Sequence, residues 1–141
     1  MTNEIQKQDW KQFFDDTSKT YLGWQTRVEV LKEDIGAQIL SDGLSLTGFV
    51  FEEKTVEGGE KQNSIEIILG EESGAHQTHT VVNPRAVAFL RNDEPAAGAI
   101  EIEDEEQAKT LVYLVQPVSI EAVYIEVEES ASVVTTANFG E

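Results

Sequence analysis

The apolar pattern of this chain changes its period at Gly23, and that change limits the folds open to it. Before Gly23, aromatic and apolar residues recur at the spacing of one helical face, whereas after it they alternate with polar residues. Alternation is typical of strands that bury one face and expose the other. No later segment has a helical period long enough for a crossover between parallel strands. The pattern therefore predicts one helix followed by an antiparallel sheet.

The helix is expected over about Trp10–Leu22. Asp9 before it and Gln12 three residues later resemble a capping box, and Gly23 suits the left-handed residue that ends a helix. The face that must be buried carries apolar and small residues at helical spacing: Trp10, Phe13, Phe14, Thr17 and Tyr21.

The strands are expected to be short and separated by turn signals. They are Thr26–Leu31, Ile35–Leu40, Leu46–Phe51, Ser64–Leu69, His76–Val82, Ala99–Glu103, Lys109–Val115 and Ile120–Val127. Turns are expected at Lys32–Asp34 and Asp42–Gly43, an exposed loop at Glu52–Asn63, and either a strand or a helical turn at Arg85–Leu90. The predicted fold is mainly β (α+β), with about eight short, mostly antiparallel strands forming a roll or small barrel.

The chain length fits one domain. We expect residues 1–127 to form a single β-rich domain and residues 128–141 to form a flexible acidic and polar tail. The absence of cysteine excludes disulfides and thiolate metal sites and fits a reducing compartment, so we expect a cytoplasmic protein. The first twenty residues contain no apolar run and the chain has no stretch of eighteen apolar residues, so neither a secretory signal nor a membrane span is expected.

Negative charge is concentrated late in the chain. The formal net charge is -17, and residues 93–141 hold twelve acidic residues against one base, Lys109. Such a charge repels nucleic-acid backbones and anionic membranes and attracts cations or a basic protein. We therefore expect no direct binding to nucleic acid or membranes. Mimicry of nucleic acid, directed at a DNA- or RNA-binding protein, is a special form of the same idea.

His76 and His79 are the candidate metal ligands. Two imidazoles three residues apart can hold one ion on a helix, but on a strand this odd separation sends them to opposite faces. Because the segment is predicted to be a strand, we favour ordinary turn and edge histidines and predict no cofactor. Glu101 and Glu103 share a strand face that suits a hard cation, but the same alternation is typical of a solvated face.

Trp24 and Arg85 are the candidate ligand-binding residues. Trp24 is either an exposed ligand platform or, as is more common at the start of a strand, part of the core. Arg85 follows Asn83-Pro84 in a compact turn, where it either pairs with a nearby carboxylate or grips a carboxylate ligand. Gly70–Gly74 lacks the lysine of a phosphate cradle, and Ser73 does not lie in a nucleophile elbow, so no catalytic residue is predicted.

A series of short motifs runs from about Trp10 to Pro117: Trp10-x-x-Phe13-Phe14-Asp15, Gly23, Val28-Glu29-Val30, Gly36-x-Gln38, Leu46-x-Gly48, His79 and Asn83-Pro84. Taken together, they resemble a family of small bacterial proteins catalogued only as a domain of unknown function. The resemblance implies a compact β-rich domain, with no activity, cofactor or catalytic residue to carry over.

These observations favour a non-enzymatic binding or regulatory domain that acts through an acidic surface on a basic protein partner. One alternative is a small β-barrel enzyme or ligand-binding protein with a pocket at one mouth. Another is a weakly metal-binding accessory protein.

Overall fold

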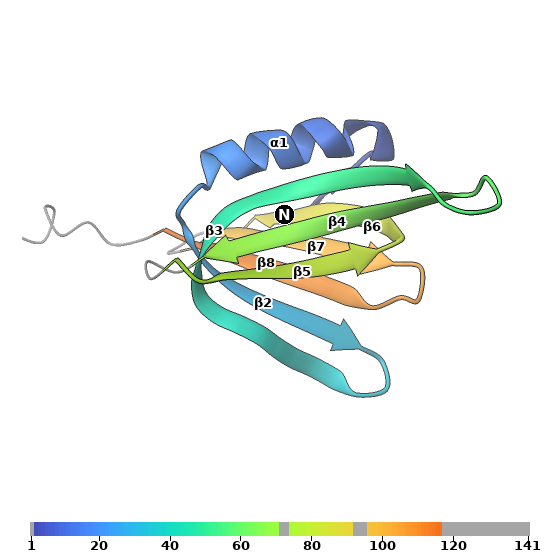
Figure 1. The fold of residues 1–141 in the computed structure, drawn as a ribbon. Coiled ribbons are helices and arrows are strands. Elements are labelled where there is room, and N and C mark those ends of the chain that lie inside the picture. Colours follow the sequence, from blue (N-terminus) through green and yellow to red (C-terminus); the bar gives the residue numbers. More distant parts are fainter. Residues whose placement is uncertain (1, 71–73, 92–95, 117–141) are drawn as a thin grey trace, which may run out of the picture.

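The computed structural model describes residues 2–70, 74–91 and 96–116, which form one antiparallel sheet and one α-helix (Figure 1). Neighbouring strands follow the order β1-β6-β7-β8-β2-β3-β4-β5. The elements are β1 (Thr2–Ile5), a 3₁₀ turn (Lys7–Asp9), α1 (Trp10–Thr20), β2 (Gln25–Lys32), β3 (Gly36–Thr55), β4 (Lys61–Gly70), β5 (His76–Val82), β6 (Pro84–Arg91), β7 (Ala96–Asp104) and β8 (Lys109–Val115). The mainly β prediction, with one helix before an antiparallel sheet, is confirmed.

The sheet curls into a roll but does not close. β1 and β5 lie at its two ends, and the curl brings β4 against β6 and β5 against β7. Residues that alternate along the strands point into the roll and form its core together with α1. The largest fully buried side chains are Trp10, Phe14, Val28, Leu46, Ile65, Ile67, Leu69, Val87, Ile100, Ile102, Val112 and Leu114. This burial of apolar surface supplies the main driving force for folding.

Strand β3 is twenty residues long and serves two parts of the sheet. Its first half pairs with β2, its second half pairs with β4, and Ser45 pairs on both sides. The predicted turn at Asp42–Gly43 is therefore wrong. Gly43 supplies a positive φ of 97°, and the pairing register shifts beside β2 and β4, so irregularities within a continuous strand take the place of a turn.

Helix α1 packs its aromatic face against the second half of β3, as the apolar stripe predicts. Trp10 and Phe14 are 1% and 0% exposed, so both count as core residues. The Trp10 ring meets the ring of Phe51 edge-on at 5.5 Å, and the Phe14 ring lies 5.3 Å from that of Phe49. Aromatic pairs in such tilted arrangements add stabilisation to that of area burial alone.

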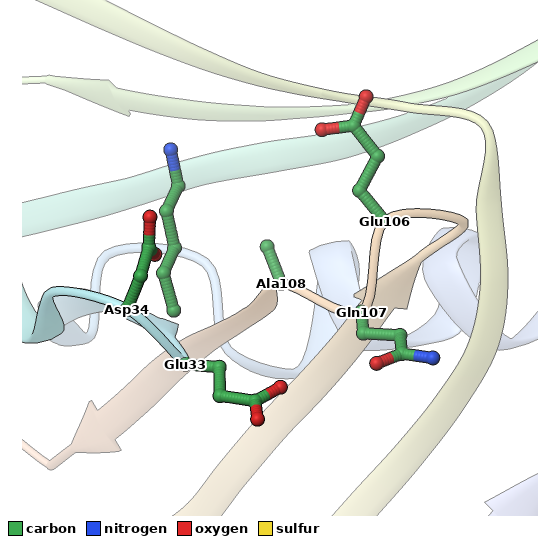
Figure 2. A pocket seen from close by; sticks show the side chains of 6 residues that line it. Glu33, Asp34, Glu106, Gln107 and Ala108 are labelled. Carbon is green, nitrogen blue, oxygen red and sulfur yellow. The ribbon is translucent and has the colours of Figure 1, made fainter.

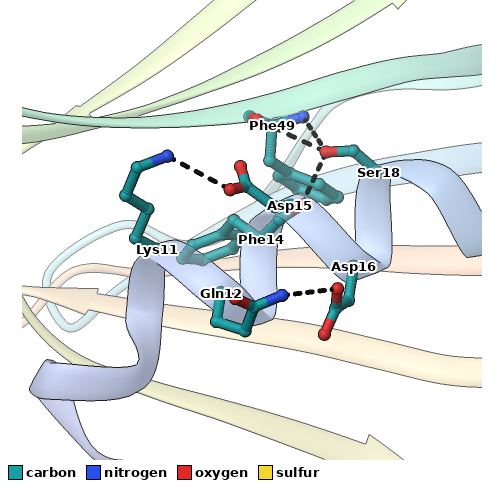
Figure 3. Close-up of polar contacts among 7 residues, drawn as sticks. All are labelled: Lys11, Gln12, Phe14, Asp15, Asp16, Ser18 and Phe49. Carbon is teal, nitrogen blue, oxygen red and sulfur yellow. Dashed lines mark hydrogen bonds and ion pairs between the residues drawn. The ribbon is translucent and has the colours of Figure 1, made fainter.

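Ser18 connects the helix to the backbone of β3 (Figure 3). Its Oγ accepts a hydrogen bond from the Phe49 N–H at 2.8 Å, and its hydroxyl hydrogen faces the carbonyl oxygens of Phe14 at 2.7 Å and Phe49 at 3.3 Å. Past Ser45, β3 no longer pairs with β2, so its edge there needs other partners for its polar groups. The helix supplies one of them through Ser18.

The ends of the helix differ from the prediction. A 3₁₀ turn precedes it, and the Asp9 side chain makes no capping bond, so the predicted capping box is wrong; Gln12 instead donates to Asp16 at 2.8 Å. The helix ends at Thr20 rather than near Leu22. Gly23 does adopt a positive φ of 84°, and its N–H donates to the Leu46 carbonyl at 2.9 Å, which directs the chain into β2.

Two strands differ in extent from the prediction, and one strand was not predicted. β1 has no counterpart in the sequence analysis; the Trp10 Nε1–H donates to the Ile5 carbonyl at 3.0 Å and so connects this strand to the helix. The ambiguous Arg85–Leu90 segment belongs to β6, and strand structure extends to Thr55 and from Lys61, which shortens the predicted loop. The predicted strand Ile120–Val127 and the predicted tail lie outside the described residues.

Replacing Ser18 with alanine should destabilise the fold by about 1–3 kcal/mol, because the partly buried N–H of Phe49 loses its acceptor. Urea unfolding monitored by tryptophan fluorescence measures this loss. Thr20→Ala, at the exposed last residue of the helix, is the matched control and should change stability by less than about 0.5 kcal/mol. Equal losses in the two variants would contradict the role given to Ser18.

Candidate functional site

The two histidines lie on opposite faces of β5. His79 is paired with Ile67, whose side chain is fully buried, so His79 points toward the core. His76 is paired with Gly70 on the other face and is exposed. The strand therefore separates the two imidazoles. Among the described residues, no group of three or more histidine, aspartate and glutamate side chains is arranged to hold a metal ion.

His79 is half-buried and its Nε2 has no hydrogen-bond partner among the described residues. Burial lowers the pKa of His79 below its ordinary value, because desolvation disfavours the charged imidazolium. The side chain is thus held neutral beside the core. This environment suits a structural residue that contributes to packing.

Trp24 and Arg85 have local partners. Trp24 packs at the margin of the core, with its ring 4.8 Å from that of Tyr21 in an edge-on arrangement. Arg85 lies in β6 rather than in the predicted turn, and it forms an ion pair with Glu103 at 3.1 Å across the β6–β7 pair. It therefore has the nearby carboxylate partner that one of its two interpretations expects. Both partners are accessible to solvent, so the pair contributes little to stability. The structure does not bring Trp24, Arg85 and the histidines together.

Two hairpin turns meet at one end of the roll. Leu31 pairs with Lys109, which places the β2–β3 turn beside the β7–β8 turn. Between them lies a hollow of about 690 Å³, which we call the acidic hollow (Figure 2). Its walls are Lys32, Glu33, Asp34, Glu106, Gln107 and Ala108. Figure 2 shows the side chains of Glu33 and Asp34 on one turn and that of Glu106 on the other, with the methyl group of Ala108 between them.

The β7–β8 turn is held by its own acidic residues. Asp104 accepts hydrogen bonds from the backbone N–H groups of Glu106 and Ala108 at 2.9 and 3.0 Å. Glu105 accepts one from the Asn83 side-chain amide at 2.9 Å, and its own N–H donates to the Asn83 carbonyl at 3.1 Å. Asn83 has a positive φ of 53°, which asparagine tolerates better than most residues. These bonds fix the turn that presents Glu106.

The remaining carboxylates of the acidic hollow face solvent. Glu33, Asp34 and Glu106 are exposed, and none forms an ion pair with another described residue. Lys32 is the one base among the residues that form its walls. The hollow therefore carries net negative charge and can receive a cationic group from a partner.

A second hollow of about 320 Å³ lies beside the first, between β2, β5 and the β7–β8 turn, and shares Lys32, Glu106 and Ala108 with it.

The core of the roll consists of packed apolar side chains. Within the described parts of the chain, the buried polar side chains are Thr17, Thr26, Ser41 and Thr110, and none of them is charged. A buried acid that could serve as a general acid or base is thus absent from these parts.

Sequence reasoning missed the three exposed acids of the acidic hollow. The sequence predicts a turn at Lys32–Asp34 and an excess of acidic residues from residue 93 onward, but no local pattern relates the two segments. Their proximity depends on the pairing of β2 with β8, which are about eighty residues apart. A matching hydrophobic register between those two strands was the only signal that could have suggested it.

Comparison with known proteins identifies a family whose function is unknown. Residues 1–123 match a family model described as "Family of unknown function (DUF5335)". No curated protein and no solved structure matches the chain. Within the residues described, no helix is long and apolar enough to cross a membrane.

Substitution of His79 by leucine should weaken the dependence of stability on pH. Since burial lowers the folded-state pKa, the unfolded chain binds a proton at higher pH than the folded one, and wild-type stability falls as the pH drops through about 6.5. The fall levels off below the folded-state pKa. Urea unfolding between about pH 7.5 and 5.5 should show a smaller loss for His79→Leu than for wild type.

Thr78→Leu, at an exposed position of the same strand, is the control for the added leucine and should keep the wild-type dependence on pH. Parallel pH curves for wild type and His79→Leu would contradict the assignment.

Proposed function

We propose that this chain, which belongs to the family of unknown function DUF5335, is a non-enzymatic binding or regulatory domain that engages a basic protein partner through its acidic hollow. The observation that most directly supports this proposal is that Glu33, Asp34 and Glu106 surround one hollow, although they lie on turns of two separate hairpins. A lysine or arginine side chain placed there faces acids on two sides. Charge complementarity of this kind accelerates encounter and favours partners of the opposite sign.

The net charge of the whole chain supports the same proposal. At -17, the protein attracts cationic surfaces over a distance set by the ionic strength of the solution. The same charge disfavours direct contact with nucleic acid or with anionic membranes. We propose that the protein works in the bacterial cytoplasm, because its cysteine-free sequence fits a reducing compartment.

The packed interior favours this proposal over an enzyme or ligand-binding barrel. A small-molecule site of that class is a concave pocket, mostly apolar, with a few polar groups that converge. Here the inward positions of the strands are occupied by packed side chains, and the acidic hollow lies between two turns, where three exposed acids form half of its walls. The separated histidines likewise lend no support to a metal-dependent function.

The proposal predicts that neutralising the acidic hollow abolishes capture of basic proteins. The variant Glu33→Gln/Asp34→Asn/Glu106→Gln removes three negative charges and keeps side-chain size. In pull-downs quantified by mass spectrometry, wild type should retain basic proteins at low salt and lose them at high salt, and the variant should lose them at both.

The control variant is Asp15→Asn/Glu57→Gln/Glu60→Gln, which removes the same charge from exposed positions on α1 and the β3–β4 turn that form no part of the acidic hollow. It should capture partners as wild type does. If both triple variants lose binding equally, net charge alone is responsible and the acidic hollow is not the site. If wild type retains no basic protein at low salt, the proposed function is wrong.

A further inference from the structure

Strand β3 has two unpaired edges, and the structure covers only one of them. Beyond Ser45, the edge that faced β2 is covered by α1, which hydrogen-bonds to it through Ser18. Before Ser45, the opposite edge has no partner, because pairing with β4 begins only at Ser45. Among the described residues, no strand lies on that side of Gly36–Leu44, and we call the uncharged part of this segment, Gly36–Ser41, the free edge. In Figure 1 this part of β3 forms the outer border of the β2–β3 hairpin, away from α1.

The free edge is apolar and exposed. Ile39 and Leu40 are 55% and 41% exposed, and Ile35 in the adjoining turn is 54% exposed. The stretch Gly36–Ser41 has no charged residue and no proline. Natural edge strands are usually protected by charges, prolines, shortness or a covering element. By comparison, β1, at one end of the sheet, has only four residues, which gives the protection of shortness that the free edge lacks.

Acidic residues flank this edge at both ends. Glu33 and Asp34 precede it in the turn of the acidic hollow, and Asp42 follows the uncharged stretch. Six residues of extended strand cover about 20 Å, long enough for several main-chain hydrogen bonds to an added strand. The complementary ligand has alternating β-branched residues in its middle and basic residues at its ends.

We propose that the free edge of β3 binds an extended basic-flanked peptide segment of the partner by strand addition, with its terminal cations facing Glu33, Asp34 and Asp42. This inference rests on the proposed function, since it assumes a basic partner, and it adds where and in which conformation that partner binds. Main-chain hydrogen bonds then give affinity, and contacts with Ile39 and Leu40 give preference for apolar side chains.

Charge favours this occupant over a second copy of the chain. Antiparallel pairing of two free edges about a two-fold axis between Gln38 and Ile39 would place Asp34 of each copy near Gly43 of the other, next to Asp42. Like charges opposite one another across a strand pair are destabilising, and each copy carries a net charge of -17. A basic peptide replaces that repulsion with attraction.

Three synthetic peptides test the proposal. KKVTVTVKK has the expected pattern, KKVTPTVKK keeps its charge but cannot form a continuous ladder, and EEVTVTVEE reverses its charge. Fluorescence anisotropy should show that KKVTVTVKK binds at least about tenfold more tightly than either of the others. Amide hydrogen exchange should slow in Gly36–Ser41 when KKVTVTVKK is bound.

Variants of the protein locate the site independently. Ile39→Ser should weaken binding of KKVTVTVKK by about five- to tenfold, because it removes apolar contact at the edge. Val56→Ser, at another exposed apolar residue between β3 and β4, should leave binding unchanged. Because Ile39 is exposed, its loss should not prevent folding, which circular dichroism verifies.

The outcomes separate the two proposals. If KKVTVTVKK and KKVTPTVKK bind equally, and binding still requires Glu33, Asp34 and Glu106, strand addition is wrong and the proposed function stands. If neither lysine peptide binds, strand addition is contradicted, and retention of basic proteins in the low-salt pull-down decides whether the proposed function stands. If light scattering shows a dimer that Ile39→Ser dissociates, the free edge is occupied by a second copy and the peptide proposal is overturned.

Discussion

The packing of α1 on the second half of β3 is the contact on which the rest of the fold depends. It buries Trp10 and Phe14 almost completely and provides, through Ser18, a hydrogen-bond partner for backbone that β2 has left. Where a strand stops pairing with its neighbour, backbone N–H and C=O groups and apolar side chains become exposed at the same place. Both kinds of exposure are unfavourable unless another element covers them. One amphipathic helix covers both here. The sheet can therefore curl from β2 through β3 to β4 around a single core.

Local pattern predicted the elements of this fold well because the signals are local. The stripe from Trp10 to Tyr21 and the alternation in β2, β4 and β8 reflect which face each element buries. Each of these patterns can be read within one continuous segment of the sequence. The turn predicted at Asp42–Gly43 is wrong because the same dipeptide occurs in turns and in bulges, and pairing with β2 and β4 decides between them. β1 carried no signal of its own, since four residues cannot show a period.

The candidate site was less predictable for a related reason. Glu33 and Glu106 belong to different hairpins, and they approach each other only because β2 pairs with β8. The composition predicted an acidic protein but not the place in the structure where acidic side chains come together. The histidines show the opposite case, because the parity of their spacing on a strand was enough to place them on opposite faces.

The continuity of β3 has a consequence for how this domain can be divided. Because one unbroken strand belongs to both halves of the sheet, a cut near Ser45 would leave two fragments, each lacking a strand that its own half needs. The halves are thus expected to unfold together as one cooperative unit. The turn between Thr55 and Lys61, by contrast, joins two strands that already pair, and its residues are exposed. New chain termini or an inserted domain would be tolerated there, at the tip of that hairpin, and nowhere along β3 itself.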